Sequence, residues 1–399
     1  MPSVTAEIQL QAPVKLAYRA FTNSTSLREW LCDAATVDPH PNGRIYLAWR
    51  RDFFSSGHYL ELEENKRVVF QWRSNTDPGP TRVTVTIKEA SGGVRLQLDH
   101  TVPDDPSWLM LASGFQKYWE DSLQNLKSVL ETGIDLRIAT RPMLGILPGD
   151  FTPEQAQALK IPVREGIRLD GVVDGMGAQQ AGLQRDDLIV KMGGKDITSD
   201  FNTLTNALAG RKGGENVEVV FYRGAEKKTV TMQLSKRPMP DVPFEPPKLA
   251  AQARALYQPA LAELEKCFEG YSDEQAMRRP DPKEWSALEV VAHLIQGERF
   301  NAILLSSLVD GYELTNDGFG SNVTAAVEAT VKANPSIQLM LDALRRSVEE
   351  ILIYTELLPE EFAANRASYY RFGSILLQPN FHITAHTQQI KDALAAAGK

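Results

Sequence analysis

Residues 285–295 read WSALEVVAHLI, and this stretch decides the fold of the last third of the chain. It has helical periodicity but is apolar almost all round, and such a helix has to be buried among other helices. Helical periodicity also covers residues 250–268, 286–308, 334–352 and 379–397. Four helices of this length predict a four-helix bundle over residues 248–399.

Three of the six histidines of the chain fall in this bundle. His382 and His386 are four residues apart, so they project from one face of a helix and can bind one ion together. Gln389 continues the same stripe, where it can orient a ligand or hydrogen-bond a bound water. His293 lies on the buried helix, and Gly297, one turn further on, leaves room beside its ring.

A buried imidazole needs a partner, because its ring nitrogens lose water on burial. Three imidazoles that converge are best explained by a metal ion. The other interpretation is three unrelated histidines, each satisfied by its own hydrogen bonds, since pairs at this spacing also arise by chance. The spacing alone leaves both interpretations open.

Residues 285–294 and 381–390 resemble the DinB-type family of four-helix bundles. That family has one metal-binding histidine after a W-S-x-x-E start on its second helix and two in an H-x-x-x-H-x-x-Q stretch on its fourth. The resemblance implies that His293, His382 and His386 bind one divalent metal. Three neutral imidazoles would leave an open coordination position, as in catalytic sites. Zinc is the expected ion, and nickel or ferrous iron also suits histidine ligands.

An ion in such a site lowers the pKa of a bound water or thiol and so creates a nucleophile near neutral pH. Residues 382–386 lack the Glu that follows the first His in zinc proteases, so peptide hydrolysis is not indicated. Enzymes of the family activate a low-molecular-weight thiol for transfer or isomerisation. The resemblance therefore implies a thiol cosubstrate, while the residues identify no catalytic side chain besides the ligands.

Residues 237–248 read RPMPDVPFEPPK, with five prolines in twelve residues, and predict a stiff extended linker over 237–247. The module before it spans residues 138–236. Its strongest pattern is AQQAGL at 178–183, followed by DLIV at 187–190 and GGK at 193–195. This pattern resembles a PDZ domain of the bacterial, protease-associated type, although Asp186 stands where the family usually has Gly.

The PDZ resemblance implies that an extended peptide adds to a sheet edge while backbone amides in a tight loop bind its terminal carboxylate. The loop needs a glycine for close backbone approach. The implied peptide-binding residues are Leu144, Gly145 and Ile146 in the loop and Leu204 and Leu208 in the side-chain pocket. The alternative is a domain that only packs against its neighbours. Nothing upstream supplies a Ser-His-Asp set, so the module serves something other than a protease.

Residues 1–133 combine a strand at 4–10, a helix at 13–30, strands at 44–49, 56–62 and 67–72, a hairpin around residues 91–93, and a helix at 106–132 that ends at Gly133. This order resembles the START-like (SRPBCC) superfamily, in the branch named for an activator of a heat-shock chaperone's ATPase. The residues that carry the resemblance are 8–13, 21–22, 27–30, 68–72 and 115–132.

In the START-like superfamily the final helix covers an apolar cavity, so the resemblance implies a small apolar ligand. Six aromatic residues would line this cavity: Phe53, Phe54, Trp72, Trp108, Phe115 and Trp119. A filled aromatic core explains them equally well. His58 and His100 have no partner at ligand spacing and are interpreted as ordinary polar positions.

The whole chain, 399 residues with a formal net charge of -8, is long enough for two or three cores. Its acidity and scattered basic residues argue against a nucleic-acid partner. The first residues lack a secretory pattern, and no stretch is apolar enough to span a membrane. Cys32 and Cys267 lie in different modules, which suits reduced thiols in the cytoplasm.

The sequence thus predicts a multidomain α+β chain: a helix-grip domain, a PDZ β-barrel-like domain and an all-α four-helix bundle. One hypothesis is a cytoplasmic binding protein that combines an apolar-ligand or chaperone-type module, C-terminal-peptide binding and a three-histidine metal site. The alternative is an enzyme in which the bundle is a metal-dependent thiol transferase or isomerase. By analogy with the domain order, either fits a role in stress response or detoxification.

Overall fold

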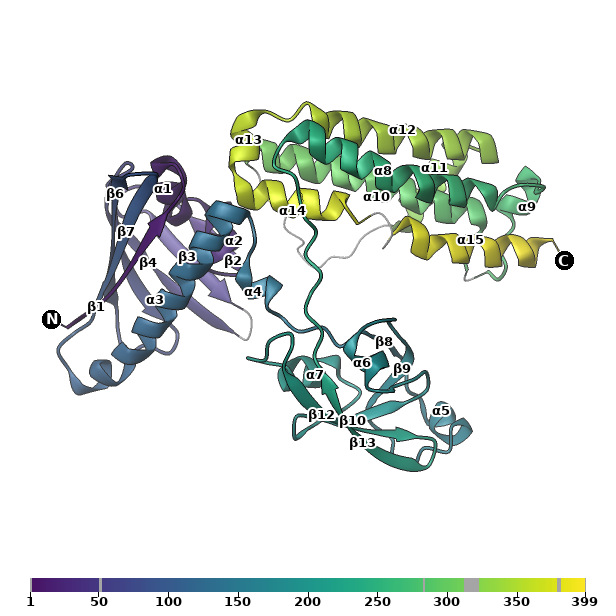
Figure 1. The fold of residues 1–399 in the computed structure, drawn as a ribbon, viewed down its shortest axis with the longest axis horizontal. Coiled ribbons are helices and arrows are strands. Elements are labelled where there is room, and N and C mark those ends of the chain that lie inside the picture. The colour runs from purple at the N-terminus through teal and green to yellow at the C-terminus, as the bar shows by residue number, and fades with distance from the viewer. Residues whose placement is uncertain (1, 50–51, 283, 312–322, 379–381, 399) are drawn as a thin grey trace. The chain divides into compact units, whose positions relative to one another are not determined.

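The computed structural model describes residues 2–49, 52–282, 284–311, 323–378 and 382–398. The contacts among them divide the chain into two compact units (Figure 1). The first unit combines Met1–Asp135 with Pro240–Lys399, and the second is Leu136–Met239. The helix-grip domain and the helical bundle therefore belong to one unit, and the PDZ-type domain forms the other.

The helix-grip domain is a seven-stranded antiparallel sheet with a long helix packed against it (Figure 1). The helix α3 (Pro106–Thr132) begins at Asp105, whose carboxylate accepts the amide of Ser107, and ends at Gly133 with φ 74°. The strand order is β1 (Ser3–Leu10), β7 (Gly93–Thr101), β6 (Thr81–Ala90), β5 (Arg67–Ser74), β4 (Phe53–Glu63), β3 (Arg44–Trp49) and β2 (Ala34–Val37).

The single helix predicted over residues 13–30 is wrong, because the structure has two helices there, α1 (Val14–Thr22) and α2 (Ser24–Trp30). Asn23 between them has an extended backbone, and its side-chain oxygen accepts the amide of Ser26 at 3.0 Å. Asparagine favours this cap position because its side chain competes with the helix backbone for hydrogen bonds.

Aromatic side chains pack closely in the helix-grip core. The rings of Trp72 and Trp119 are 5.5 Å apart, and Trp108 is also buried. The contact between Trp72 and Trp119 favours the filled-core interpretation for these two tryptophans. His100 is completely buried among them, so its interpretation as an ordinary polar position is wrong. It continues the inward alternation of β7, which also buries Val94, Leu96 and Leu98.

The second unit is built around a small antiparallel sheet. Its strand order is β13 (Glu226–Gln233), β12 (Asn216–Arg223), β10 (Leu188–Met192), β9 (Ile167–Val172) and β8 (Ile146–Gly149), with β11 (Lys195–Asp196) paired to β10. Its short helices are α4 (Leu136–Ala139), α5 (Pro153–Ala158), α6 (Gly177–Gln180) and α7 (Phe201–Ala207). Asp186 adopts the left-handed conformation expected of the family's Gly, with φ 67°, and accepts a hydrogen bond from Arg168 at 2.8 Å.

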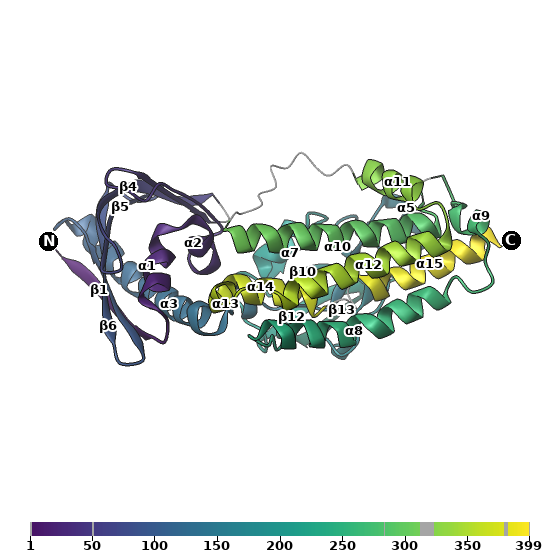
Figure 2. The same cartoon turned by 90° about the horizontal axis from the view of Figure 1, so that it is seen from above.

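The bundle contains α8 (Pro246–Lys266), α10 (Ala287–Asp310) and α12 (Ile337–Glu356), and α14 (Arg366–Leu376) followed by α15 (Ile383–Ala397) forms its fourth side (Figures 1 and 2). Of the fourth predicted helix, residues 379–381 lie outside the described residues. The sequence periodicity did not single out α9 (Asp273–Met277), α11 (Val323–Ala333), α13 (Glu360–Ala364) or α14.

A capping box fixes the start of the buried helix α10. The hydroxyl of Ser286 accepts a hydrogen bond from the amide of Glu289 at 3.2 Å, and the carboxylate of Glu289 accepts one from the amide of Ser286 at 2.8 Å. This reciprocal pair satisfies two amides that a helix start leaves without partners. The S-x-x-E part of the quoted motif is therefore a helix-start signal, and it sets the position of His293 two turns later.

The second half of the proline-rich segment lies against α14 within the first unit. Val242 is buried, and the ring of Phe244 is 5.9 Å from that of Tyr369. The hydroxyl of Tyr370 donates to the carbonyl of Pro240 at 2.9 Å. Helix α14 also packs on α3, so this segment is held by side-chain contacts from Pro240 onward.

Candidate metal centre

The three histidines predicted as ligands lie together at one place in the bundle. His293 comes from α10, His382 is the residue just before α15, and His386 lies in the first turn of α15. The Nε2 atoms of His293 and His382 are 3.2 Å apart. One ring nitrogen from each of the three histidines lies within 4.8 Å of the other two.

The geometry of the three rings fits a metal ion. A zinc–nitrogen distance of about 2.0–2.1 Å in a tetrahedral site places two ligand nitrogens about 3.3 Å apart. The 3.2 Å between the Nε2 atoms of His293 and His382 is close to this value. Each pair of rings meets edge to face, with centroids 5.0 or 5.1 Å apart.

The protonation states also suit ligands. Burial lowers the pKa of His293, and the neighbouring His386 lowers it further. Burial lowers the pKa of His382 to about 4, with smaller contributions from His293 and His386. An imidazole binds a metal only in its neutral form, and these two rings are neutral at pH 7.

Gln389 lies where it can orient His386. Its side-chain oxygen is 2.8 Å from Nδ1 of His386. If this oxygen accepts the Nδ1 proton, the Nε2 atom of His386 keeps a free lone pair for a metal. The geometry thus favours the first of the two roles predicted for Gln389. The ring of Trp285 packs against that of His293, with ring centroids 5.1 Å apart.

Gly297 makes room for a different ring from the one predicted. A Cβ atom at this position would lie 2.7 Å from Cε1 of His382. The sequence placed the space beside His293, one turn away on the same helix. The prediction named the wrong histidine because the ring that fills the space belongs to the facing segment, and a single helix does not show its neighbours.

We expect Gly297→Ala to weaken metal binding by about 10- to 100-fold, the range seen when a residue that positions a ligand is lost. Alanine favours a helix over glycine by about 1 kcal/mol, so the helix itself should not suffer. The added methyl group would displace His382. Competition with a coloured chelator measures the affinity. Gly114→Ala in α3, where a Cβ meets nothing within 4 Å, is the matched control. Unchanged affinity in Gly297→Ala would contradict the role assigned to this glycine.

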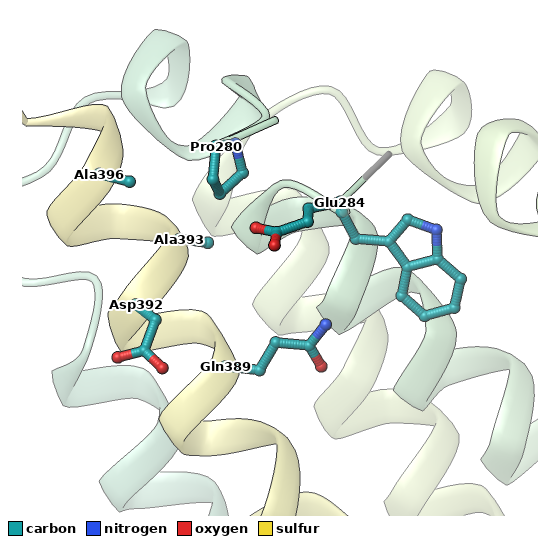
Figure 3. A pocket seen from close by; sticks show the side chains of 7 residues that line it. Pro280, Glu284, Gln389, Asp392, Ala393 and Ala396 are labelled. Carbon is teal, nitrogen blue, oxygen red and sulfur yellow. The ribbon is translucent and has the colours of Figure 1, made fainter. Parts of the chain in front are cut away.

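Two hollows adjoin the histidines. One, of about 770 Å³, is lined by His293 and His382 and by the exposed apolar side chains of Phe300, Ile303 and Ile375. The other, of about 670 Å³, is lined by Trp285 and Gln389, which contact His293 and His386, and also by Pro280, Glu284, Asp392, Ala393 and Ala396 (Figure 3). Small molecules can therefore approach the histidines.

The first hollow also contains a buried carboxyl group, that of Glu298, which the sequence patterns did not single out. Glu298 is 3% exposed, and its oxygens accept hydrogen bonds from Tyr257 at 3.2 and 3.3 Å and from Asn301 at 3.4 Å. Burial raises its pKa, and these hydrogen bonds oppose the rise. A charged residue five positions after His293 on a largely apolar helix was the available signal.

The residues predicted for peptide binding also come together, in the second unit. Leu144, Ile146, Leu204 and Leu208 belong to one hydrophobic cluster, in which Leu144 and Leu204 are buried. The strand β8, which begins at Ile146, lies at the edge of the sheet. An edge strand offers unpaired backbone groups to an incoming peptide strand.

The loop before β8 has free backbone donors. Gly145 has φ 74°, and a Cβ atom there would lie 2.2 Å from the Cβ of Met176. The carbonyls of Leu144 and Gly145 accept hydrogen bonds, but among the described residues no backbone acceptor pairs with their amides. Successive free amides in a tight turn form an anion-binding loop.

Comparison with known families accounts for all three modules. Residues 11–131 match the family described as "Activator of Hsp90 ATPase homolog 1-like protein", residues 140–234 match the PDZ domain, and residues 250–390 match the DinB superfamily. These matches confirm the predicted three-module chain. The protein thus combines a START-like domain, a PDZ domain and a DinB-like helical domain.

Curated relatives share part of the chain. "Serine protease Do-like HtrA" from Lactococcus lactis subsp. lactis is 33% identical over 102 residues, which is 24% of this chain and 25% of the relative. "Probable periplasmic serine endoprotease DegP-like" from Marinomonas sp. is 27% identical over 115 residues, 29% of this chain and 23% of the relative. The chain therefore spans about a quarter of the length of these relatives.

Solved structures show similar partial matches. A protein from Mesorhizobium loti is 22% identical, covering 33% of this chain and 97% of its own, with a TM-score of 0.31. The Aha1 dimer from Colwellia psychrerythraea is 18% identical, covering 33% and 97%, with a TM-score of 0.30. DynU16, from the dynemicin biosynthetic locus, is 17% identical, covering 58% and 86%, with a TM-score of 0.32.

Within the described ranges, the helices fall short of the length and apolar character that crossing a membrane requires.

Proposed function

We propose that the C-terminal bundle binds one divalent metal through His293, His382 and His386 and uses it as an open, catalytic-type site. The observation that carries the proposal is the convergence of three imidazoles, two with Nε2 atoms 3.2 Å apart, beside a hollow of about 770 Å³. Three neutral ligands leave the ion its double charge and an open position. Zinc is the ion we expect, and nickel or ferrous iron also suits the ligands.

The reaction class we propose is thiol transfer or isomerisation, which the DinB resemblance implies, with a low-molecular-weight thiol as cosubstrate. A divalent ion in this site would lower the pKa of the thiol. His293, His382 and His386 would hold the ion, and Gln389 would fix the tautomer of His386. The apolar wall of the hollow would exclude water and contact the body of the second substrate.

The test is turnover by the zinc-loaded, full-length protein. A small thiol and a chromogenic aryl halide are mixed with the protein, and the coloured thioether is measured. We expect a rate above the uncatalysed reaction that His382→Ala abolishes. Turnover that survives His382→Ala would show that the reaction does not use this site, and would refute the enzymatic part of the proposal.

A second function is favoured by the edge strand and free amides of the PDZ domain. We propose that this domain binds the C-terminal peptide of a protein partner. The terminal carboxylate would accept hydrogen bonds from the amides of Leu144 and Gly145. The peptide would add as a strand to β8, and Leu204 and Leu208 would contact an apolar final side chain.

We expect Gly145→Glu to abolish binding to a C-terminal peptide array. The new side chain would collide with Met176, would strain a backbone at φ 74°, and would place a negative charge beside the peptide carboxylate. Gly210→Glu is the control, since Gly210 has φ 77° but its Cβ would meet nothing within 4 Å. An array without C-terminal preference, or one unaffected by Gly145→Glu, would contradict this function.

For the helix-grip domain, an apolar ligand or a chaperone contact stays a prediction, as do the cytoplasmic location and the role in stress response or detoxification. We propose that the two other modules bring a partner or substrate to the bundle. This view unites the binding and the enzymatic hypotheses, because binding modules and a catalytic-type site then serve one reaction.

A further inference from the structure

Glu298 is poorly explained as a structural residue. Its oxygens share one hydrogen bond from the hydroxyl of Tyr257, at 3.2 and 3.3 Å, and accept another from Asn301 at 3.4 Å, and these distances exceed the normal range. Among the described residues, no Lys or Arg forms an ion pair with it. A carboxylate 3% exposed without a cation is costly, and such costs are concentrated at functional sites.

The surroundings of Glu298 point to chemistry in the adjoining hollow. Glu298 lines the same hollow as His293 and His382. On α8, the hydroxyl of Tyr257 lies 3.2 and 3.3 Å from the two carboxylate oxygens, and its one proton orients the carboxyl group. Arg299 also lines the hollow but donates to Thr330 at 3.5 Å. Glu298 is thus a buried, positioned carboxyl group that shares a hollow with His293 and His382 of the three-histidine cluster.

We infer that Glu298 is the proton acceptor of this site, taking the proton of the thiol that enters the hollow beside His293 and His382. This inference rests on the function proposed above. Burial raises the pKa of Glu298, which brings its basicity closer to that needed near neutral pH. A buried base also keeps the proton away from bulk water until it is needed.

The proton and electron balance is complete without any further reactant. The S–H bond of the thiol breaks, its proton moves to the Glu298 carboxylate, and its electron pair stays on sulfur. The sulfur then forms an S–C bond to the second substrate while the bond from that carbon to its leaving group breaks. The leaving group departs as an anion with the electron pair, and Glu298 gives its proton to water once the product has left the hollow. The net reaction joins thiol and electrophile in a thioether and releases the leaving-group anion and one proton.

The lining of the hollow indicates the class of the second substrate. Phe300 and Ile303 are both more than half exposed, and Ile375 is 41% exposed. All three line the hollow, which is large enough for a molecule of drug size. The buried carboxyl group of Glu298 also lines the hollow. These features fit a small electrophile with an apolar body, such as an aryl or alkyl halide.

Glu298→Gln tests the inference in the full-length, zinc-loaded protein, because it keeps the shape of the side chain and an oxygen for Tyr257. The probe is 2-mercaptoethanol. Calorimetry at pH 7 in two buffers of different ionisation enthalpy counts the protons released per bound thiol. We expect almost none from the wild type, since Glu298 retains the proton, and about one from Glu298→Gln. Turnover should fall by about 10²- to 10⁴-fold, the usual contribution of a general base.

Two further variants keep the test sharp. Glu350→Gln replaces an exposed glutamate on α12 and should release as few protons as the wild type. Tyr257→Phe removes the hydrogen bonds to Glu298 but leaves the carboxyl group, so proton release should also stay close to zero. If Glu298→Gln loses its zinc, Glu298 supports the metal site and the acceptor role is refuted.

The remaining outcomes separate this inference from the proposed function. If wild type and Glu298→Gln bind the thiol and release equal numbers of protons, Glu298 is not the acceptor, while the metal-dependent function stands. If the zinc-loaded wild type binds no thiol, the proposed thiol chemistry fails and the acceptor role fails with it.

Discussion

We expect the purified, untagged protein to lose its metal when His382 and His386 are both replaced by alanine. The wild type should carry about one equivalent of zinc, nickel or iron, because one ring nitrogen from each of the three imidazoles lies within 4.8 Å of the other two, and three such ligands would leave an ion one open position. The double variant keeps only His293. Loss of a residue that supports a ligand lowers metal affinity by about 10- to 100-fold. Loss of a ligand itself should lower the affinity further. Mass spectrometry of the metal content measures the result.

The matched control is His40→Ala/His58→Ala, which also removes two histidines but takes them from exposed positions in the helix-grip domain. This variant should keep its metal. Absence of metal from the wild type, even after reconstitution with zinc, would make the three histidines packing residues. The protein would then be a three-module binding protein whose bundle lacks catalytic chemistry.

We expect acid to weaken the helix-grip domain through His100. The indole N–H of Trp119 donates to Nδ1 of His100 at 3.1 Å, so the ring proton lies on Nε2 and is donated to Thr81 at 2.7 Å. The hydroxyl of Thr81 donates in turn to the carbonyl of Trp72 at 3.0 Å. This chain of hydrogen bonds is complete only with a neutral imidazole. Burial lowers the pKa of His100 from 6.5 to about 4.

The sign of the effect follows from proton binding. Between pH 6.5 and about 4 the unfolded chain holds a proton on His100 that the folded domain does not hold. The free energy of unfolding therefore rises with pH across this window. The contribution of the neutral His100 to that free energy is fully present above pH 6.5 and is lost as the pH falls to about 4. At about 1.4 kcal/mol per pKa unit, the contribution is about 3 kcal/mol.

Urea unfolding followed by tryptophan fluorescence at pH 7 and pH 4.5 measures this contribution. His100→Gln, whose amide can both donate and accept, should show a much smaller loss of stability between the two pH values than the wild type. His58→Gln, at an exposed position, should behave like the wild type. If His100→Gln and the wild type lose the same stability on acidification, the neutral buried imidazole is not the cause.

The ends of helices were predicted correctly where a capping residue next to the helix sets them. Asp105 and Gly133 fix the two ends of α3, and its predicted bounds agree with the structure. The Ser286–Glu289 capping box likewise fixes the start of α10. Caps act within one turn, so the residues that determine them are neighbours in the chain. The prediction failed at Asn23, although that signal is also local, because the cap residue lies inside a stretch with apolar helical periodicity and was overlooked.

Signals that depend on a neighbouring element were missed. His100 looked like a polar position because its partners, Thr81 and Trp119, come from β6 and α3. Glu298 was overlooked because its partner Tyr257 lies on α8. In both cases the chemistry of the residue is set by burial, and burial depends on which segments the fold brings together.

The sequence by itself determined the three modules, the periodicity of their main elements and the identity of the three candidate ligands. The main elements follow from local hydrogen bonding and from the two-residue and 3.6-residue periods of strands and helices. The assignment of the modules and of the candidate ligands rests on the family resemblances, because spacing alone left two interpretations of the histidines open. Only the tertiary structure decided that His293 meets His382 and His386, that Gly297 clears space for His382, and that Glu298 shares their hollow. Helix packing sets these distances, because it joins positions about 90 residues apart that no local pattern relates.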